Sequence, residues 1–400
     1  MTFNKKWGGV LLISGTAIGA SILALPIVTR QNGFFPTTVA FIICWFFMML
    51  AALLLLEVNL RITGEKDFIS MVEATLGKSS QWIAWVIYLL LLYTLIALYL
   101  TGCSAWLVKV GDSLGVSFSL SMAVLIMALV VGMIVSYGTW VVDHINRYFV
   151  LGLVVSYGIL IGCAAPSVEF SKVVEGEFTN LTATFPVIVS AFGFSVVLPS
   201  LTTYLDRDLK SLRFAVIVGS LIPLVIYLIW EFVTLGIIPK TGPESLASLA
   251  LNHNNGTGVA LALENISGNL WITQSSRWFA IFAIVTSLLG VSLALHHFLQ
   301  DGLKLKKTSR DQLLLGIATF VPPTIVVLFY PAAFNEILGI AGILIAFLLG
   351  ILPALMAWRS RQNRELIRKY RVFGGKTMLI SVMAFFSYII YLELNGFIHG

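Results

Sequence analysis

Charged residues are scarce in this chain. Only 11% of its 400 residues are Asp, Glu, Lys or Arg, whereas 58% are hydrophobic. A soluble domain carries about a quarter charged residues, so the composition excludes a soluble globular protein and predicts an all-α membrane protein. The apolar runs are continuous rather than alternating, which argues against membrane-spanning strands.

Cysteine and the common catalytic motifs are also scarce. The three cysteines lie in apolar stretches and form no C-x-x-C or Cys/His pair, so we expect no metal site, disulfide or cofactor. The chain has no H-E-x-x-H, P-loop or nucleophile-elbow motif, and we expect no catalytic residue. The pattern His296-x-x-x-x-Asp301 matches an acyltransferase motif, but so short a pattern arises easily by chance. A membrane enzyme therefore stays a remote alternative.

Eleven segments are long and apolar enough to cross a bilayer, since a spanning helix needs about 20 apolar residues. They cover residues 7–29, 35–58, 81–108, 119–140, 147–166, 182–204, 214–238, 274–299, 312–330, 335–357 and 376–396. With the N-terminus in the cytoplasm, 20 of the 25 basic residues fall in cytoplasmic segments, where such residues gather. The odd number of spans then places the C-terminus outside. Because this asymmetry accounts for the basic excess, the expected surrounding is membrane lipid and not nucleic acid.

Two of these segments are interrupted at their middles. The first span carries small residues and a proline between Gly15 and Pro26, and the sixth does so between Ser190 and Ser200. Glycine and proline weaken a helix and free backbone amides and carbonyls at a depth where lipid cannot satisfy them. Matched interruptions in two halves of a chain point to a transporter's binding site.

The interrupted spans stand first in two successive sets of five. Five is an odd number, so the second set crosses the membrane in the opposite sense and forms an inverted repeat with the first. The predicted parts are residues 1–166 (spans one to five), 167–358 (spans six to ten) and 359–400 (a basic cytoplasmic loop and span eleven).

Several motifs, in this order, resemble those of a known family. They are Gly15-Thr-x-Ile-Gly-Ala-x-x-Leu-Ala-Leu-Pro26, Leu-Leu-Leu-Leu-Glu57, Ala191-Phe-Gly-Phe194, Leu201-x-x-Tyr204-x-Asp206 and Thr286-Ser-Leu-Leu-Gly-Val291. They are similar to motifs of the bacterial hydroxy and aromatic amino acid permeases, and most of all to the tyrosine-specific members. The likeness covers essentially the whole chain.

This resemblance implies a LeuT-type fold with discontinuous helices one and six, in the bacterial inner membrane. It also implies import of an aromatic amino acid, tyrosine before tryptophan, by proton symport with alternating access. A sodium-coupled or serine/threonine transporter of the same fold is the alternative. The oligomeric state stays open.

A zwitterionic amino acid needs donors for its carboxylate and acceptors for its ammonium group. A helix N-terminus offers free N–H groups, so we expect the carboxylate where the outer half of span one begins. The ammonium group should meet the carbonyls that end the inner half, with partner carbonyls from span six. The backbone positions concerned are Thr16, Ala17, Gly19, Ala20, Ser21, Ser190, Ala191, Phe192 and Gly193. A simple helix-packing role for the glycine pair Gly15 and Gly19 is the alternative.

The side chains expected around the substrate ring are aromatic. Phe192 and Phe194 flank Gly193, and one of them is expected to cover the ring or to act as a gate. Tyr93 and Tyr99 on span three are similar candidates; they are six residues apart, so at most one should line the pocket, and Tyr99 is preferred. Ordinary packing is the alternative for each, since the chain has 27 phenylalanines.

Four residues are candidates for holding the coupling ion. The carboxyl groups of Glu57 and Glu231 lie within spans, where ionisable residues are rare and functional. For Glu57, near the cytoplasmic end, an ion pair is the slightly favoured alternative. Thr286 and Ser287 in span eight could complete a sodium site, although such hydroxyls also bond to their own helix.

Overall fold

The computed structural model describes residues 5–62, 67–179, 181–242, 245–251, 258–303, 309–330, 334–363 and 370–399. Within these ranges every regular element is a helix. Several basic residues used above for orientation lie outside the described residues, namely Lys66 and those of 304–308 and 364–369. The longer helices are α1 (Lys5–Ala17), α2 (Ser21–Thr29), α3 (Phe34–Arg61), α4 (Phe68–Leu76), α5 (Lys78–Ser113), α6 (Leu120–Ser136), α7 (Thr139–Ala164), α11 (Leu209–Ile237), α13 (Gly258–Ser267), α14 (Leu270–Gly302), α15 (Ser309–Phe329), α16 (Phe334–Ile345), α17 (Leu352–Gln362) and α18 (Gly375–His399).

The shorter helices connect or interrupt these. They are α8 (Phe170–Val174), α9 (Phe185–Ala191), α10 (Leu198–Tyr204) and α12 (Leu246–Leu251), with 3-10 turns at Ala165–Ser167, Leu181–Thr184 and Phe194–Val197 and a π-helical turn at Ala346–Ile351. Among the described residues, nine helical stretches are long and apolar enough to cross a membrane. The pair α1 and α2, bent by 56°, makes a tenth, and α6 is a shorter apolar helix. The chain is thus a multi-pass membrane protein whose described elements are all helices, while the count of eleven spans stays a prediction.

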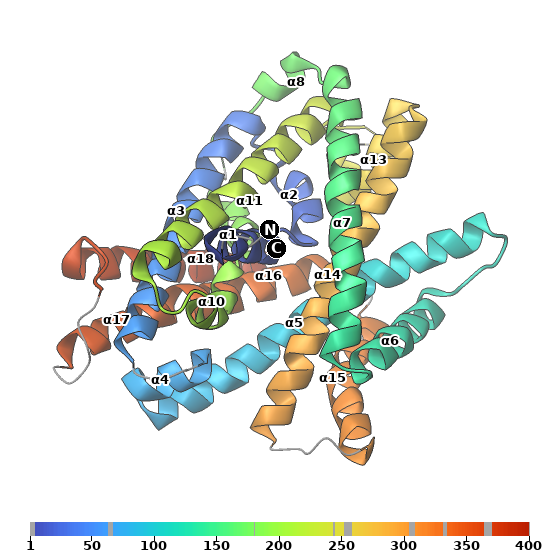
Figure 1. The fold of residues 1–400 in the computed structure, drawn as a ribbon. Helices are drawn as coiled ribbons and strands as arrows, with labels where there is room; N and C mark the ends of the chain where they lie inside the picture. Colours follow the sequence, from blue (N-terminus) through green and yellow to red (C-terminus); the bar gives the residue numbers. More distant parts are fainter. Residues whose placement is uncertain are drawn as a thin grey trace.

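The long helices pack in pairs around the middle of the molecule (Figure 1). Helices α7 and α14 lie side by side, and α3 runs along α11. Helix α1 packs against α11, and α5 contacts α14, α15 and α16. Asp208 caps the N-terminus of α11, and hydrogen bonds from Ser211 hold the pKa of this carboxyl below its ordinary value. Helix α1 thus ends against α11, and α9 ends among α2, α3 and α16.

The tenth predicted segment is not one regular helix. Helices α16 and α17 are joined by a π-helical turn that ends just before Pro353. Proline has no N–H to give to the preceding turn, and a wider turn accommodates that loss. Gly350 within the turn lies against the ring of Phe386 of α18, and its lack of a side chain lets α18 approach closely.

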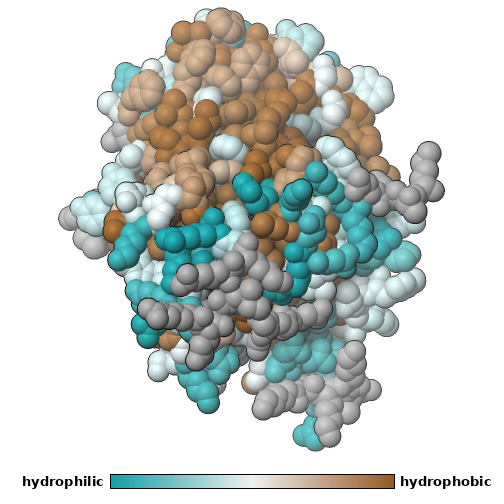
Figure 2. Space-filling view, turned by 60° about the vertical axis from the view of Figure 1, so that its left-hand side comes forward, coloured by the Kyte–Doolittle hydropathy of each residue, from teal (hydrophilic) through white to brown (hydrophobic). Residues whose placement is uncertain are grey.

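The surface agrees with a membrane location. Figure 2 shows a broad apolar area over the upper part of one face and polar side chains gathered below it. Large apolar side chains are exposed on several long helices, among them Leu129, Leu151, Val154 and Ile325. Soluble monomers rarely expose so much continuous apolar surface, so this surface is suited to lipid.

Candidate functional site

The first helix breaks between Ala17 and Ser21, within the interval that the sequence predicts. The Ala20 N–H leaves the helical pattern and donates to Ser287 Oγ of α14 at 3.1 Å, while that hydroxyl donates to the Ala283 carbonyl at 2.8 Å. A Cβ atom at Gly19 would lie 2.8 Å from Ser287 Oγ. A side chain at this position would therefore displace the Ser287 hydroxyl from the Ala20 N–H.

The second break follows Ala191. Phe192 and Gly193 are not helical, a 3-10 turn covers Phe194–Val197, and α10 then begins with Pro199 in its first turn, where proline is favoured. The Ser195 hydroxyl within the break is fully buried and has no hydrogen-bond partner among the described residues. The break lies where the sequence predicts it. Gly193 has a φ of −71°, and the nearest atom to an added Cβ would be Ser190 O at 3.4 Å, so an alanine would fit there.

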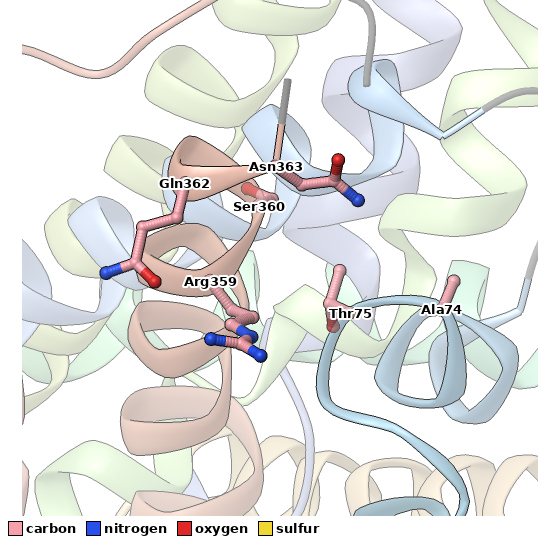
Figure 3. Close-up of a pocket in the computed structure, with 6 residues that line it drawn as sticks. All are labelled: Ala74, Thr75, Arg359, Ser360, Gln362 and Asn363. Atoms are coloured by element: carbon pink, nitrogen blue, oxygen red, sulfur yellow. The ribbon is translucent and has the colours of Figure 1, made fainter. Parts of the chain in front are cut away.

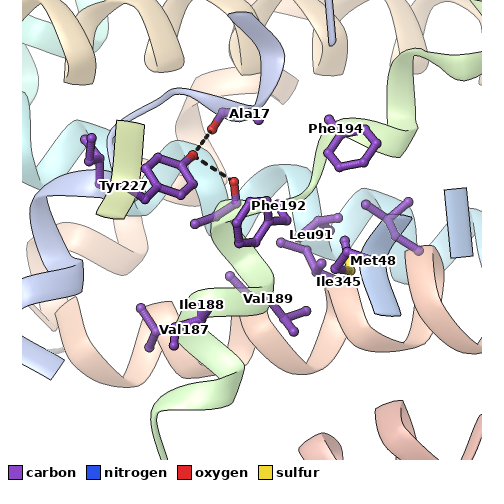
Figure 4. Packing of buried hydrophobic residues seen from close by; sticks show 14 of the residues in the cluster. Ala17, Met48, Leu91, Val187, Ile188, Val189, Phe192, Phe194, Tyr227 and Ile345 are labelled. Carbon is purple, nitrogen blue, oxygen red and sulfur yellow. Dashed lines mark hydrogen bonds between the residues drawn. The ribbon is translucent and has the colours of Figure 1, made fainter. Parts of the chain in front are cut away.

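A tyrosine of α11 joins the two breaks. The Tyr227 hydroxyl lies 2.6 Å from the Ala17 carbonyl oxygen and 2.9 Å from the Ala191 carbonyl oxygen, as Figure 4 shows. These are the carbonyls at the ends of α1 and α9. Tyr227 is absent from the residues predicted from the sequence. A tyrosine inside an apolar span was a usable signal, because its hydroxyl needs a partner there.

Aromatic rings enclose this hydroxyl. Phe192 contacts Tyr227 with ring centroids 5.3 Å apart, and Phe41 of α3 contacts both rings. Phe192 and Phe194 are fully buried, so neither presents an open face in this arrangement. Figure 4 shows Phe192 beside Tyr227 and Phe194 farther along the chain. The structure thus brings Phe192 to the breaks and adds Phe41, which the sequence did not point out.

Not all of the predicted residues reach this centre. Tyr99 of α5 does, since its side chain lies beside Ser287. The hydroxyls of Thr16, Ser190 and Thr286 instead bond to carbonyls of their own helices. The Thr16 side chain is exposed, away from the buried Ala17.

The two candidate carboxyl groups have opposite surroundings. Glu231 of α11 is fully buried, receives one hydrogen bond from Thr29 at the end of α2 (2.8 Å) and has no partner for Oε1 among the described residues. Glu57 is also fully buried, but it contacts Arg61 at 2.8 Å and Arg361 at 2.7 Å. It also accepts from the Val372 N–H at 2.8 Å. The ion pair weighed for Glu57 is present.

The end of the molecule near Lys5 is held by contacts between α1 and the segment after α10. Lys5 forms an ion pair with Asp206 (2.7 Å), and Gly8 lies against the Tyr204 hydroxyl. Asp206 and Arg207 both have positive φ, and Arg207 donates to the Asn59 and Ile62 carbonyls at the end of α3. The tight turn after α10 therefore connects α1 with α3.

A polar pocket lies elsewhere in the fold, between α4 and the end of α17. Its volume is 410 Å³, and its walls are formed by Ala74, Thr75, Arg359, Ser360, Gln362 and Asn363 (Figure 3). None of these residues belongs to the breaks. The pocket is therefore separate from the candidate site.

Comparisons with known proteins identify the family of the chain. The model of the tryptophan/tyrosine permease family matches residues 2–393. The chain belongs to the tryptophan/tyrosine permease family. The permease is 32% identical to tyrosine-specific transport system 1 of Haemophilus influenzae, over 95% of this chain and 94% of that protein. It is 31% identical to tyrosine-specific transport system 2 of the same organism, over 95% and 94% of the two chains. It is also 31% identical to a tryptophan-specific transport protein of Pseudomonas aeruginosa, over 94% and 91%.

Family membership confirms both the resemblance seen in the sequence and the expectation that the chain is not an enzyme. The structure gives the acyltransferase-like pattern another explanation. His296 is buried, and its Nε2 atom lies 3.0 Å from the Gln312 amide oxygen of α15. The histidine thus serves as a contact between α14 and α15 in this permease.

Proposed function

We propose that this permease imports an aromatic amino acid, tyrosine first and tryptophan next, by proton symport across the bacterial inner membrane. The observation that supports this most is the meeting of two helix breaks at one point, around Ala17, Ala20 and Ala191. Two carbonyl ends and an amide that has left the helical pattern converge there, and such groups can bind the two charges of an amino acid. The names of the relatives supply the aromatic substrate class.

The matching lengths of the helices support the five-plus-five repeat. After the first break come α3 with 28 residues and α5 with 36, and after the second come α11 with 29 and α14 with 33. With α6 and the bent pair counted as spans, eleven helices cross the membrane. The parts 1–166 and 167–358 are then the two repeats, and 359–400 adds the last span. One helix bundle rocks against the other and exposes the site to each side of the membrane in turn.

Glu231 is the better of the two carboxyl groups for the coupling proton. An unpaired charge is costly to bury, so a carboxyl with one neutral partner holds a proton readily. Glu57 is instead engaged by Arg61, Arg361 and the Val372 N–H, so its two oxygens already have partners. The bond from Thr29 to Glu231 connects this proton site with α2, the outer half of the broken helix.

The hydroxyls of Thr286 and Ser287, the candidates for a sodium site, already form hydrogen bonds within the protein. A sodium ion needs oxygen lone pairs directed at it, but Ser287 Oγ faces the Ala20 N–H, a donor that repels a cation. Thr286 donates to carbonyls of its own helix, which leaves its oxygen lone pairs free and does not distinguish the two ions. The Ser287 contact counts against sodium and supports protons as the coupling ion.

Uptake into proteoliposomes tests the proposal. An outside-acid gradient should concentrate labelled tyrosine in the lumen without sodium. Glu231→Gln should lose this concentration but keep the exchange of labelled for unlabelled tyrosine, because exchange needs no net proton movement. Glu393→Gln makes the same change in α18 and serves as the matched control, which should keep gradient-driven uptake. A requirement for sodium, or full concentration by Glu231→Gln, would contradict proton coupling at this residue.

A further inference from the structure

The polar backbone groups at the helix breaks are bonded to the protein's own hydroxyls. The Tyr227 hydroxyl lies between the carbonyls of Ala17 and Ala191, at 2.6 and 2.9 Å. The Ser287 hydroxyl accepts from the Ala20 N–H at 3.1 Å. One hydroxyl therefore acts as a donor to the carbonyl ends, and the other acts as an acceptor for the amide only three residues along the chain.

We propose that these two hydroxyls stand in for the two charged groups of the amino acid. Tyr227 occupies the position of the ammonium group, Ser287 occupies that of the carboxylate, and the substrate binds by displacing both. This inference rests on the proposed function, since it assumes an amino acid substrate. It gives Tyr227 a part in the recognition of the ammonium group, although Tyr227 is not among the site residues predicted from the sequence.

The number of available donor hydrogens explains why an ammonium group would displace the Tyr227 hydroxyl from the two carbonyl oxygens. A tyrosine hydroxyl has one hydrogen, so it cannot donate fully to two carbonyl oxygens at once. An ammonium group has three hydrogens and a positive charge, and charge-assisted bonds are about twice as strong as neutral ones. Ala17 also ends the 13-residue helix α1, and the negative end of a helix dipole attracts a cation.

The same reasoning holds for the carboxylate. Ser287 Oγ offers the Ala20 N–H a neutral acceptor, and the hydroxyl keeps its own bond to the Ala283 carbonyl. A carboxylate would offer a charged acceptor to the same N–H. The Ser287 hydroxyl would then keep the bond to Ala283, so its displacement leaves no buried donor unpaired.

Binding of three related probes tests the proposal. Tyrosine carries both charged groups, tyramine has no carboxylate, and 3-(4-hydroxyphenyl)propionate has no ammonium group. Their affinities are measured by displacement of labelled tyrosine from the purified permease. The variants are Tyr227→Phe, Ser287→Ala and the matched control Tyr93→Phe. Tyr93 also donates to one carbonyl, that of Ala318 at 2.7 Å, but it links α5 to α15.

Tyr227→Phe removes the competitor for the ammonium group only. It should tighten the binding of tyrosine and tyramine by roughly three- to tenfold, the range of one net hydrogen bond, and leave hydroxyphenylpropionate unchanged. Ser287→Ala should tighten tyrosine and hydroxyphenylpropionate and leave tyramine unchanged. Tyr93→Phe should not separate the probes.

Two results would overturn the inference. Weaker binding of tyramine to Tyr227→Phe would make the hydroxyl a direct ligand of the substrate. An equal change for all three probes would show a purely structural role. Failure of the proposed function gives a different result, because wild-type permease would then bind neither tyrosine nor tryptophan.

Discussion

Gly15 and Gly19 stand four residues apart in the first span but differ in what a side chain would meet there. A Cβ atom at Gly15 has no neighbour within 4 Å, whereas one at Gly19 lies 2.8 Å from Ser287 Oγ. Gly19→Ala puts a methyl group next to the Ala20 N–H, where the carboxylate is proposed to bind, and should lower tyrosine uptake by roughly tenfold or more, since small misplacements in a site are costly. Initial uptake rates measure this effect.

Gly15→Ala is the matched control and should leave uptake near the wild-type rate. Alanine also favours helix over glycine by up to about 1 kcal/mol, so this variant should be no less stable than wild type. The double variant Gly19→Ala/Ser287→Ala should recover part of the uptake that Gly19→Ala loses, because the clashing Ser287 oxygen is gone. If Gly15→Ala and Gly19→Ala reduce uptake equally, the two glycines act as a helix-packing pair.

Sequence alone located the backbone of the site better than its side chains. The intervals around Gly19 and Gly193 contain both breaks, because weak helix formers and prolines act locally. Tyr227 and Phe41 were missed, because their contacts join residues far apart in the sequence. The hydroxyl of Tyr227, for example, reaches Ala17 across 210 positions of the chain.

At the scale of helices, the buried charges of Glu57, Arg61 and Arg361 hold α3, α17 and the start of α18 together. Arg361 bonds both to Glu57 and to the Gly375 carbonyl. Glu57→Gln leaves two buried arginines without their charged partner. The variant should lose about 3–5 kcal/mol of stability, the usual cost of breaking a buried pair. Thermal unfolding in detergent measures the loss.

An exposed pair of the same spacing provides the control. Asp143 and Arg147 on α7 are also four residues apart, with 49% and 72% of their side chains exposed. Asp143→Asn should cost less than about 1 kcal/mol, because water screens such pairs. Equal losses of stability in Glu57→Gln and Asp143→Asn would mean that the buried charges do not stabilise the packing of α3, α17 and α18.

At the scale of the whole molecule, helix α11 touches every part of the broken first helix. Ser14 of α1 donates to the Gly219 carbonyl, Tyr227 donates to Ala17 at the break, and Thr29 of α2 donates to Glu231. Tyr227 and Glu231 are one helical turn apart. A change at the proposed substrate site and a change at the proposed proton site would therefore both act on α11, which gives a physical route for their coupling.

The number of spans decides the overall topology. An odd number places the two termini on opposite sides of the membrane, and the basic residues favour a cytoplasmic N-terminus. The decisive element is α18, which follows the basic segment and has only 22% of its most apolar stretch buried by the rest of the protein. A helix with so little cover from its neighbours needs lipid around it, so we expect it to cross the membrane.

Reporter fusions test this topology. Alkaline phosphatase needs disulfides and is active only outside the cytoplasm. Joined after Gly396, beyond most of α18, it should be active, whereas joined after Phe373, before α18, it should be inactive. Activity that is the same at both positions would mean that α18 does not cross the membrane. Only the ten helices of the inverted repeat would then cross the membrane, and the C-terminus would lie on the same side as the N-terminus.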